Sequence, residues 1–334
     1  HDPDPTVRAS VAKQFGMHGR TSFLPALLAA TEDSVALVRQ EALIALGSMQ
    51  NRWLDHEDKI LTAAQALTHD DHLGTRVEAL IVTSVGVQKR LQGARNASLA
   101  GDLVGAESLM VAALAFAPGD KRAAYDLGRL YLDKGDTVNG QQVMRRHGLL
   151  MDVPRLRAAP AIDGVPDEPV WQDAAHTDSL WLISRDHEAA LPTDIRTDLY
   201  VGWRVDGLYI AMVAWDPEPA DLVIGLQQDD DDTRGSWIED RLEIFLDPTL
   251  SRSRFVQLCI NPEGTITDGS LPSEDEFAWD AEGTWASHVE DDRWSTEVFL
   301  RFTEDMSRPE PGQMWGANLV RCFRGQEFIM WVRT

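Results

Sequence analysis

A large aromatic residue followed by a carboxylate marks the stretch of this chain best suited to bind a ligand. Trp237 ends a polar loop, and Glu243 follows six residues later in a segment, 240–247, with the alternating pattern of a strand. A rigid ring can stack on the apolar C–H face of a sugar, and a carboxylate can accept hydrogen bonds from its hydroxyls. A core tryptophan beside an acidic surface is equally compatible with the spacing, because tryptophan is often buried. Both interpretations stay open at this point.

The charge of the chain is concentrated in its second half. Residues 160–334 hold 36 acidic and 13 basic residues, no lysine and ten of the eleven tryptophans, whereas residues 1–159 hold 18 of each charge. Four consecutive aspartates lie at 229–232, ahead of Trp237. This break predicts a domain boundary near residue 158. An acidic surface argues against nucleic acid as a partner, and it is compatible with Ca²⁺, which prefers oxygen ligands, or simply with solubility.

The first 87 residues have the pattern of helical repeats. Asp4-Pro5-Thr6-Val7-Arg8, with Gly16 after it, recurs 31 residues later as Ser34 to Arg39 with Gly47. A looser third copy begins at Thr75. This arrangement resembles the short HEAT repeats, and it implies helix pairs that bury their apolar faces only by stacking.

From about residue 88 the period changes. Ala106, Ala113 and Pro118 have the spacing of the later positions of a tetratricopeptide repeat, and 127–131 has the L-G-x-x-Y spacing of the next one. A second helix is expected near 137–149, although Gly140 and His147 stand where alanines are usual. Residues 88–150 therefore resemble tetratricopeptide repeats, and we expect the helical half to be a scaffold or a surface for a protein partner.

Residues 151–159 read as a linker, and an all-β pattern follows over 160–334. Asp206-Gly207 and Asn261 to Gly264 are hairpin turns between alternating segments. Many short strands separated by turns predict an antiparallel β-sandwich. The expected strands are 196–205, 208–215, 240–247, 254–261, 265–268, 284–290, 293–302, 315–323 and 327–333. The whole chain is thus expected to be an α-helical repeat solenoid followed by a β-sandwich.

An ordered set of short motifs in this second half resembles the family 9 carbohydrate-binding modules. The set consists of Ile162-Asp163-Gly164, Asp167-Glu168, Trp171, the 206–210 hairpin, Asp240, Glu243, Phe245-Leu246-Asp247, Gln257, Ile260-Asn261, Gly264, Trp294, Glu297, Trp315 to Asn318 and Arg321. The resemblance covers nearly all of 160–334. It implies a β-sandwich that binds calcium and the end units of plant-type polysaccharides, with two tryptophans sandwiching the sugar.

The resemblance also assigns residues to the expected site. Trp237 matches the first tryptophan and Glu243 a sugar-binding carboxylate, while Trp331 is the match for the second ring and Trp315 its rival. Gln257 and Arg321 complete the expected carbohydrate site. The expected calcium ligands are Asp163, Asp167, Glu168, Asp216 and Asp240.

The sequence offers alternatives to sugar binding. Asp240 and Glu243 could be the two carboxylates of a glycosidase, but residues i and i+3 of a strand point to opposite faces, so no catalysis is expected. A haem-binding electron-transfer sandwich would need a facing methionine and histidine or lysine, and no suitable spacing or attachment motif is present. Protein–protein interaction through the repeats and the haem-binding sandwich are the two alternatives to sugar binding.

The expected setting is a fragment of a larger bacterial protein that is secreted, periplasmic or on the cell surface. The chain opens with His1 inside a repeat, so a signal segment is not observable. No run of about 18 apolar residues predicts a membrane span. Cys259 and Cys322 do not form a disulfide framework by themselves, and their pairing is left open.

Overall fold

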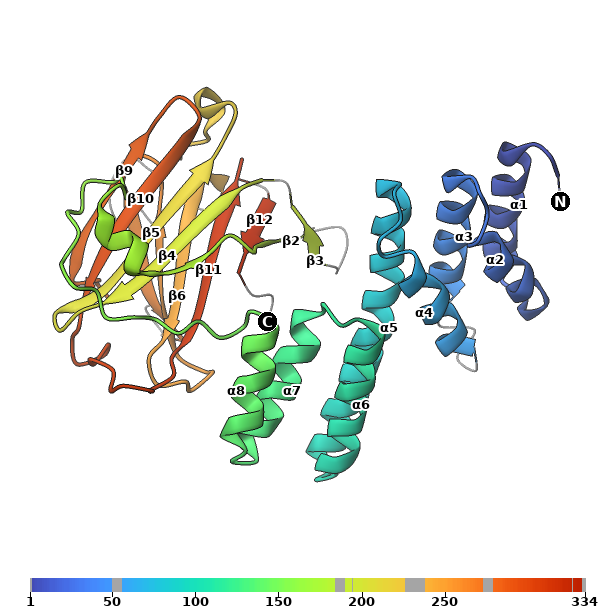
Figure 1. The fold of residues 1–334 in the computed structure, drawn as a ribbon, viewed down its shortest axis with the longest axis horizontal. Coiled ribbons are helices and arrows are strands. Elements are labelled where there is room, and N and C mark those ends of the chain that lie inside the picture. The colour runs from blue at the N-terminus through green and yellow to red at the C-terminus, as the bar shows by residue number, and fades with distance from the viewer. Residues whose placement is uncertain are drawn as a thin grey trace. The chain divides into compact units, whose positions relative to one another are not determined.

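The computed structural model describes residues 2–49, 56–183, 190–193, 195–225, 238–272, 279–325 and 327–331. The chain divides into two compact units, and the main division falls between Leu149 and Leu150, where the predicted linker begins. The first unit is built from helices and the second mainly from strands (Figure 1). Fold class is therefore as predicted.

Several helices of the first unit begin at aspartate capping residues. Asp4, Asp102, Asp120 and Asp136 each accept a hydrogen bond from a backbone N–H of the first helical turn, which satisfies a donor that the helix cannot. The helices are α1 (Pro5–His18), α2 (Leu24–Ala30), α3 (Ala36–Met49), α4 (Glu57–Ala66), α5 (Leu73–Leu99), α6 (Leu103–Phe116), α7 (Lys121–Asp133) and α8 (Thr137–Arg146), with a short 3₁₀ turn, η1 (Thr21–Phe23), before α2.

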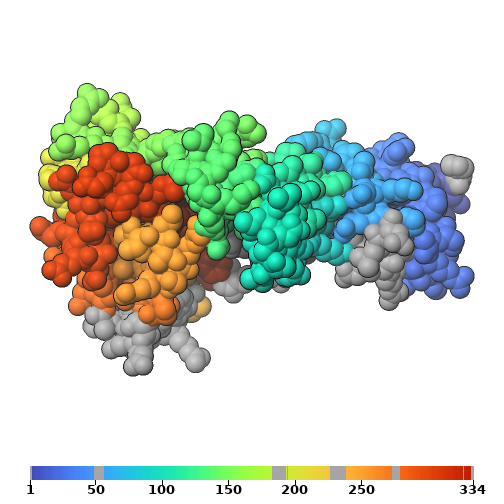
Figure 2. All heavy atoms as spheres, turned by 90° about the horizontal axis from the view of Figure 1, so that it is seen from below, coloured from blue at the N-terminus to red at the C-terminus, as the bar shows by residue number. Residues whose placement is uncertain are grey.

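The first five helices stack in layers. Helix α1 packs on α3 and α3 packs on α5, around a core that includes the fully buried Leu27, Leu43 and Leu46. A Cβ at Gly16 would lie 2.7 Å from that of Ala45, so this glycine allows α1 and α3 to approach closely. Figure 2 shows the blue and cyan layers following one another in chain order, as expected where each repeat contacts its neighbours.

Helix α5 runs for 27 residues without a break, through the predicted change of repeat type at 87/88. The sequence suggested a boundary here, but Gly86 lies inside the helix, where a Cβ would collide with the Leu61 side chain of α4. Its role is close helix packing rather than helix termination. The last HEAT-like layer and the helices that follow it therefore share one continuous helix.

The helices after α5 form a second core. Leu91, Ala106, Ala113 and Leu127 are buried together in it. Gly140, which departs from the repeat pattern, faces Gly128 across the α7–α8 contact: a Cβ at Gly140 would lie 2.9 Å from the Gly128 carbonyl oxygen. The tetratricopeptide assignment itself stays a prediction.

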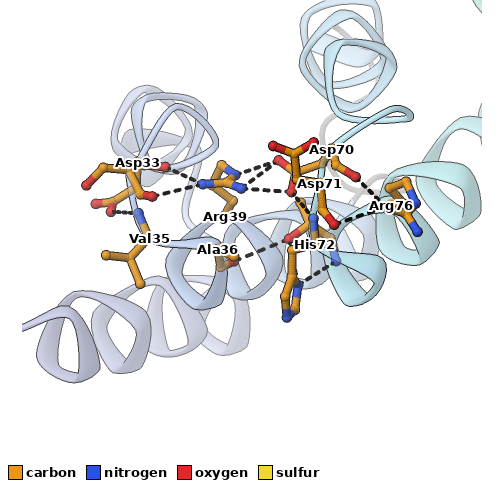
Figure 3. A network of polar contacts seen from close by, with 10 residues as sticks. Asp33, Val35, Ala36, Arg39, Asp70, Asp71, His72 and Arg76 are labelled. Atoms are coloured by element: carbon orange, nitrogen blue, oxygen red, sulfur yellow. Dashed lines mark hydrogen bonds and ion pairs between the residues drawn. The ribbon is translucent and has the colours of Figure 1, made fainter.

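Arginines link successive loops of the stacked helices. Nε and Nη2 of Arg8 donate to the two carboxylate oxygens of Asp33, at 2.7 and 2.9 Å. The same two atoms of Arg39 donate to Asp70, both at 2.8 Å, so that Arg39 bridges the two loops shown in Figure 3. We refer to Arg8, Arg39 and the equivalent Arg76 as the arginine ladder.

The second unit contains two antiparallel sheets, as expected for a β-sandwich. One has the order β1-β4-β5-β10-β9 and the other β3-β2-β12-β11-β6-β7-β8. The strands are β1 (Ala175–Thr177), β2 (Trp181–Ile183), β3 (Ala190–Pro192), β4 (Thr197–Trp203), β5 (Gly207–Trp215), β6 (Arg241–Asp247), β7 (Phe255–Ile260), β8 (Ile266–Leu271), β9 (Gly283–Val289), β10 (Arg293–Arg301), β11 (Gly316–Phe323) and β12 (Glu327–Met330), with 3₁₀ turns η3 (Pro169–Asp173) and η4 (Pro219–Asp221).

A strap of chain, residues 154–171, covers the outer face of the five-stranded sheet. Leu156 and Trp171 bury against Tyr209 and Ala211 of β5. The buried carboxylate of Glu297, in β10, accepts hydrogen bonds from the backbone N–H groups of Asp163 and Gly164, both at 3.0 Å, and from Trp171 Nε1 at 2.8 Å. The Ile162-Asp163-Gly164 motif therefore fastens the strap to the sheet.

Candidate functional site

Strand β6 gives the candidate site its position in the seven-stranded sheet. It lies between β7 and β11, and its alternation separates two faces. Leu242, Ile244 and Leu246 are buried in the sandwich core. Arg241, Glu243 and Phe245 lie on the opposite face, which we call the outer face of the larger sheet.

An ion pair lies at the start of this outer face. Arg241 Nη2 contacts the Glu243 carboxylate, and Arg241 Nη1 donates to the Glu239 carbonyl at 3.2 Å. Burial alone would lower the pKa of Arg241, but the charge and hydrogen bond of Glu243 and the two neighbouring cysteines together outweigh burial, and the pKa lies above its ordinary value. Arg241 therefore stays charged as a donor, and the Glu243 oxygens are acceptors beside it.

The two cysteines flank this pair on neighbouring strands. Cys259 of β7 is opposite Glu243, and Cys322 of β11 is opposite Arg241. Both thiols are buried and free. Because β6 runs between them, their Cα atoms are about two strand spacings, or roughly 10 Å, apart. A disulfide needs about 7 Å or less, so the two cysteines do not pair.

Amide and aromatic side chains continue the outer face beyond the ion pair. Gln257 of β7 and Asn318 of β11 are the partners of Phe245 on either side of β6. Phe245 and Phe255 meet edge to face with ring centroids 5.9 Å apart. All four side chains are half-buried. This part of the face combines hydrogen-bonding amides with apolar ring surface.

The two parts of the face differ in accessibility. The Glu243 side chain is 7 % exposed and that of Arg241 is 1 % exposed. Thr267, in the same row of the sheet, is also buried, and its hydroxyl has no hydrogen-bond partner among the described residues. The ion pair therefore lies at the bottom of the site, and a ligand would first meet the half-exposed Phe245, Gln257 and Asn318.

The expected aromatic platform, Trp237, lies outside the described residues, as does the aspartate run at 229–232. The ends of the segment that carries them are fixed beside each other. Asp240 N–H donates to the Val223 carbonyl at 2.8 Å, and Val223 N–H donates to the Asp240 carboxylate at 2.9 Å. Glu239 accepts from Gly225 N–H at 2.9 Å and from Asn261 Nδ2 at 3.2 Å. The segment therefore begins and ends at the start of β6.

Neither tryptophan expected as the second ring is an exposed platform. Trp331 follows β12 and is buried, and its backbone N–H donates to the Leu319 carbonyl at 3.1 Å. Trp315 precedes β11, is half-buried and meets Phe302 edge to face at 6.1 Å. As a buried ring, Trp331 is not available for stacking on a sugar in this conformation.

Arg321 does not lie with Glu243, which corrects the expected site. It is on the core-facing side of β11, and Nη1 donates to the carbonyls of Arg196 and Trp215 and to the Thr197 hydroxyl, at 3.0–3.1 Å. These acceptors belong to the other sheet or its approach, so Arg321 links the two sheets. Burial lowers its pKa to about 10, while the charge of Asp216 opposes the decrease.

Four of the five expected calcium ligands accept hydrogen bonds from other groups of the protein. Asp216 accepts from Arg324 Nη2 at 2.8 Å, and Asp240 from Arg324 N–H at 3.0 Å. Glu168 accepts from Ala161 N–H at 2.8 Å, and Asp163 from Val165 N–H at 3.0 Å. No group of three or more acidic, histidine or cysteine side chains suited to a metal ion occurs among the described residues. Calcium binding stays a prediction.

Sequence reasoning missed several residues of the outer face. Arg241, Phe245 and Asn318 share the face with Glu243 and Gln257, and the alternation of β6 and β11 was a sufficient signal for them. Trp181 of β2 lies in the same row as Glu243, through Met330 and Val320. Only strand pairing reveals this, because β2 is three residues long and distant in sequence.

Comparisons with known proteins give one family match and several similar solved structures. Residues 1–82 match the HEAT repeat family model, which confirms the predicted repeats there. Similar solved structures include a family 9 carbohydrate-binding module from Caldicellulosiruptor kristjanssonii in complex with cellotriose, at 14% identity and a TM-score of 0.38, with 54% of this chain and 83% of that chain covered. Another is a family 9 carbohydrate-binding module from the same organism in complex with glucose, at 14% identity and a TM-score of 0.39, with 54% of this chain and 84% of that chain covered. No curated protein matches the chain.

Among the described residues, no helix is both long and apolar enough to cross a membrane.

Proposed function

We propose that the β-sandwich binds carbohydrate without catalysing its cleavage, through the outer face of the larger sheet. The observation that carries this proposal is the grouping of Arg241, Glu243, Gln257, Asn318 and Phe245 on one face, across three neighbouring strands. Sugar hydroxyls need both donors and acceptors, and their C–H faces need apolar contact. This set contains all three kinds of group.

Each group has a distinct part in this proposal. The Glu243 carboxylate accepts from hydroxyls and Arg241 donates to ring or hydroxyl oxygens, with the strength of charged hydrogen bonds. Gln257 and Asn318 each carry a donor and an acceptor. Phe245 supplies ring surface, and Trp237, next to the start of β6 in sequence, supplies the larger platform. The setting we propose for this module is an extracellular or cell-surface protein.

The geometry gives no support to a glycosidase. Such enzymes place two carboxylates on either side of the scissile bond. Asp240, the carboxylate that the sequence pairs with Glu243, is buried directly before β6 and accepts hydrogen bonds from the backbone N–H groups of Val223 and Arg324. It does not share the outer face with Glu243, and so binding alone is proposed.

Isothermal titration with cello- and xylo-oligosaccharides tests the proposal. Trp237→Ala should lower the affinity by about 2 kcal/mol or more, as the loss of a dominant aromatic contact does. Gln257→Ala should lower it by about 1 kcal/mol, because one hydrogen-bonding side chain is lost. Trp285→Ala, in strand β9 of the other sheet, is the control and should leave the affinity unchanged.

Glu243→Gln tests the charged acceptor, and circular dichroism must first show that the variant folds, because Arg241 loses its buried partner. Repeating the titration with 1 mM calcium and with a chelator tests the predicted calcium site. Oligosaccharide bound equally by wild type, Trp237→Ala and Gln257→Ala would place the sugar site elsewhere. Absence of binding to every oligosaccharide tested would refute this ligand class.

A further inference from the structure

The arginine ladder has a repeated geometry with two functions for each arginine. Nη1 holds the loop that precedes its own helix: in Arg8 it donates to the Asp2 and Pro3 carbonyls, and in Arg39 to those of Asp33 and Ser34, at 2.8–3.2 Å. Nε and Nη2 then form a fork edge that takes both oxygens of an aspartate in the next loop. In Arg8 and Arg39, therefore, one side of the guanidinium, Nη1, binds backbone carbonyls, and the other side, Nε and Nη2, binds a carboxylate. We call these the carbonyl side and the carboxylate side.

The aspartates that fill the two positions are alike. Asp33 Oδ1 accepts from Val35 N–H and Asp70 Oδ1 accepts from His72 N–H, both at 2.9 Å and both two residues along the chain. Each carboxylate is thus fixed by its own turn before it meets the arginine. The arginine lowers the pKa of Asp33 and of Asp70, so both stay ionised.

Arg76 has the carbonyl side of this arrangement but not the carboxylate side. Its Nη1 donates to the Asp70 and Asp71 carbonyls at 2.7 and 3.1 Å, in the same way as in Arg8 and Arg39. Figure 3 shows Arg76 extending beyond the Asp70–Asp71 loop, on the side away from Arg39. Among the described residues, the ion pairs within 4.0 Å include none with Arg76.

The change of repeat type explains this difference. In the next layer, the loop in the corresponding place lies between α6 and α7. Its aspartate, Asp120, caps α7 by accepting from Ala123 N–H, three residues along, instead of forming the two-residue turn of Asp33 and Asp70. The HEAT match also ends at residue 82, shortly after Arg76. The ladder therefore ends with an arginine whose guanidinium is already oriented by two hydrogen bonds.

We propose that the fork edge of Arg76 is a docking point for an aspartate of a partner polypeptide, presented in a turn like those of Asp33 and Asp70. A guanidinium fork matches both oxygens of a carboxylate. Little side-chain freedom is lost on binding because Nη1 is already held, which lowers the entropic cost. Leu73, one turn earlier on α5, is 64% exposed and gives apolar contact that a polypeptide covers and a bare anion does not.

This inference concerns the helical unit and does not depend on carbohydrate binding by the sandwich. Its probe is the chain's own ladder loop supplied in trans: an acetylated and amidated peptide of residues 67–75, whose Asp70 fills the Arg39 position in the intact protein. The readout is the Nε–Hε resonance of each arginine in ¹⁵N-labelled full-length chain. Arg8 and Arg39 serve as internal controls, because their fork edges are filled.

The expected result is a saturable shift of the Arg76 resonance, with half-saturation at roughly millimolar peptide, and no shift for Arg8 or Arg39. The Asp70→Asn peptide should bind at least about fivefold more weakly, since it lacks the second carboxylate oxygen. In the Arg76→Lys variant, which keeps the charge but not the fork, a fluorescent form of the peptide should lose affinity similarly.

Three outcomes would overturn the proposal. One is an Arg76 resonance that does not shift at the highest peptide concentration that stays in solution. Another is equal binding of the aspartate and asparagine peptides, or of wild type and Arg76→Lys. The third is half-saturation by acetate or inorganic phosphate at the same concentration as by the peptide, which would make Arg76 a site for small anions and not for a polypeptide.

Discussion

Glu297 is a carboxylate that the sandwich keeps away from water. It is fully buried in β10, under the strap of residues 154–171, and accepts three N–H groups. Burial raises its pKa to about 7, although the three donors act in the opposite direction. At pH 6 the folded protein therefore holds a proton here that the unfolded chain has released.

This difference makes stability depend on pH. The unfolded pKa is 4.5 and the folded pKa about 7, so folding takes up a proton between these values and the free energy of unfolding falls as pH rises through this window. Ionisation of Glu297 should lower the free energy of unfolding by about 3 kcal/mol in total, and this decrease should not grow further well above pH 7. Urea titrations of wild type and Glu297→Gln at pH 5 and pH 7.5 measure it: the decrease should be present in wild type and smaller in the variant. The same decrease in both proteins would show that Glu297 does not titrate in this range.

Residue roles on the outer face were only partly predictable from the sequence. Glu243 and Gln257 could be placed together, because β6 and β7 alternate clearly and are joined by a short connection. Arg321 could have been excluded from the face, since it shares the parity of the apolar Leu319. The burial of Trp331 could not be foreseen, because it depends on which strand lies beside β11 and not on the local sequence.

At the scale of elements, the ladder joins loops that helix packing alone would leave separate. Arg39 and Asp70 have side chains that are 16% and 7% exposed. Arg39→Ala would remove the two hydrogen bonds that the Asp70 carboxylate accepts from Arg39 and leave this charge poorly solvated. We therefore expect the free energy of unfolding of the helical unit to fall by about 2 kcal/mol or more. Thermal and urea unfolding followed by circular dichroism at 222 nm tests this.

The matched control is Arg20→Ala, because Arg20 is an exposed arginine of the same unit and has no carboxylate partner in the part of the chain that the structure describes. Its effect should stay within about 0.5 kcal/mol, as for ordinary surface positions. Equal effects of the two substitutions would mean that the Arg39–Asp70 pair adds no more than an exposed charge does.

The sequence pattern predicted the longer strands, but it did not predict the three shortest strands or the uninterrupted course of helix α5. Strands β4 to β12 lie within one to three residues of the predicted strands, because alternation and turn residues define their ends. Strands β1, β2 and β3 have three residues each, too few to show a period. The continuity of α5 was missed because the change of repeat period near residue 88 was interpreted as a boundary, although one helix runs through it.

At the scale of the whole molecule, the charge and the contacts both change near residue 150. The helical and sandwich units have separate buried cores. Leu43 and Leu91 belong to the cores of the helical unit, and Leu242 and Ile244 belong to the core of the sandwich. We therefore expect residues 150–334 alone to be soluble and to melt cooperatively, at a temperature close to that of the sandwich transition in the full chain. Differential scanning calorimetry of both proteins measures this. A molten segment that folds only when residues 1–149 are added would refute independent folding.

The separation of Cys259 and Cys322 by strand β6 has a consequence for the conditions in which this molecule can mature. The two thiols of the sandwich are free and form no disulfide. Burial, with the charge of Glu243, raises the pKa of the Cys259 thiol to about 12, so that its reactive thiolate form is scarce. Folding needs no oxidant and no disulfide isomerase. The sandwich should refold at the same rate and to the same melting temperature with dithiothreitol as without it, in an oxidising or a reducing compartment alike.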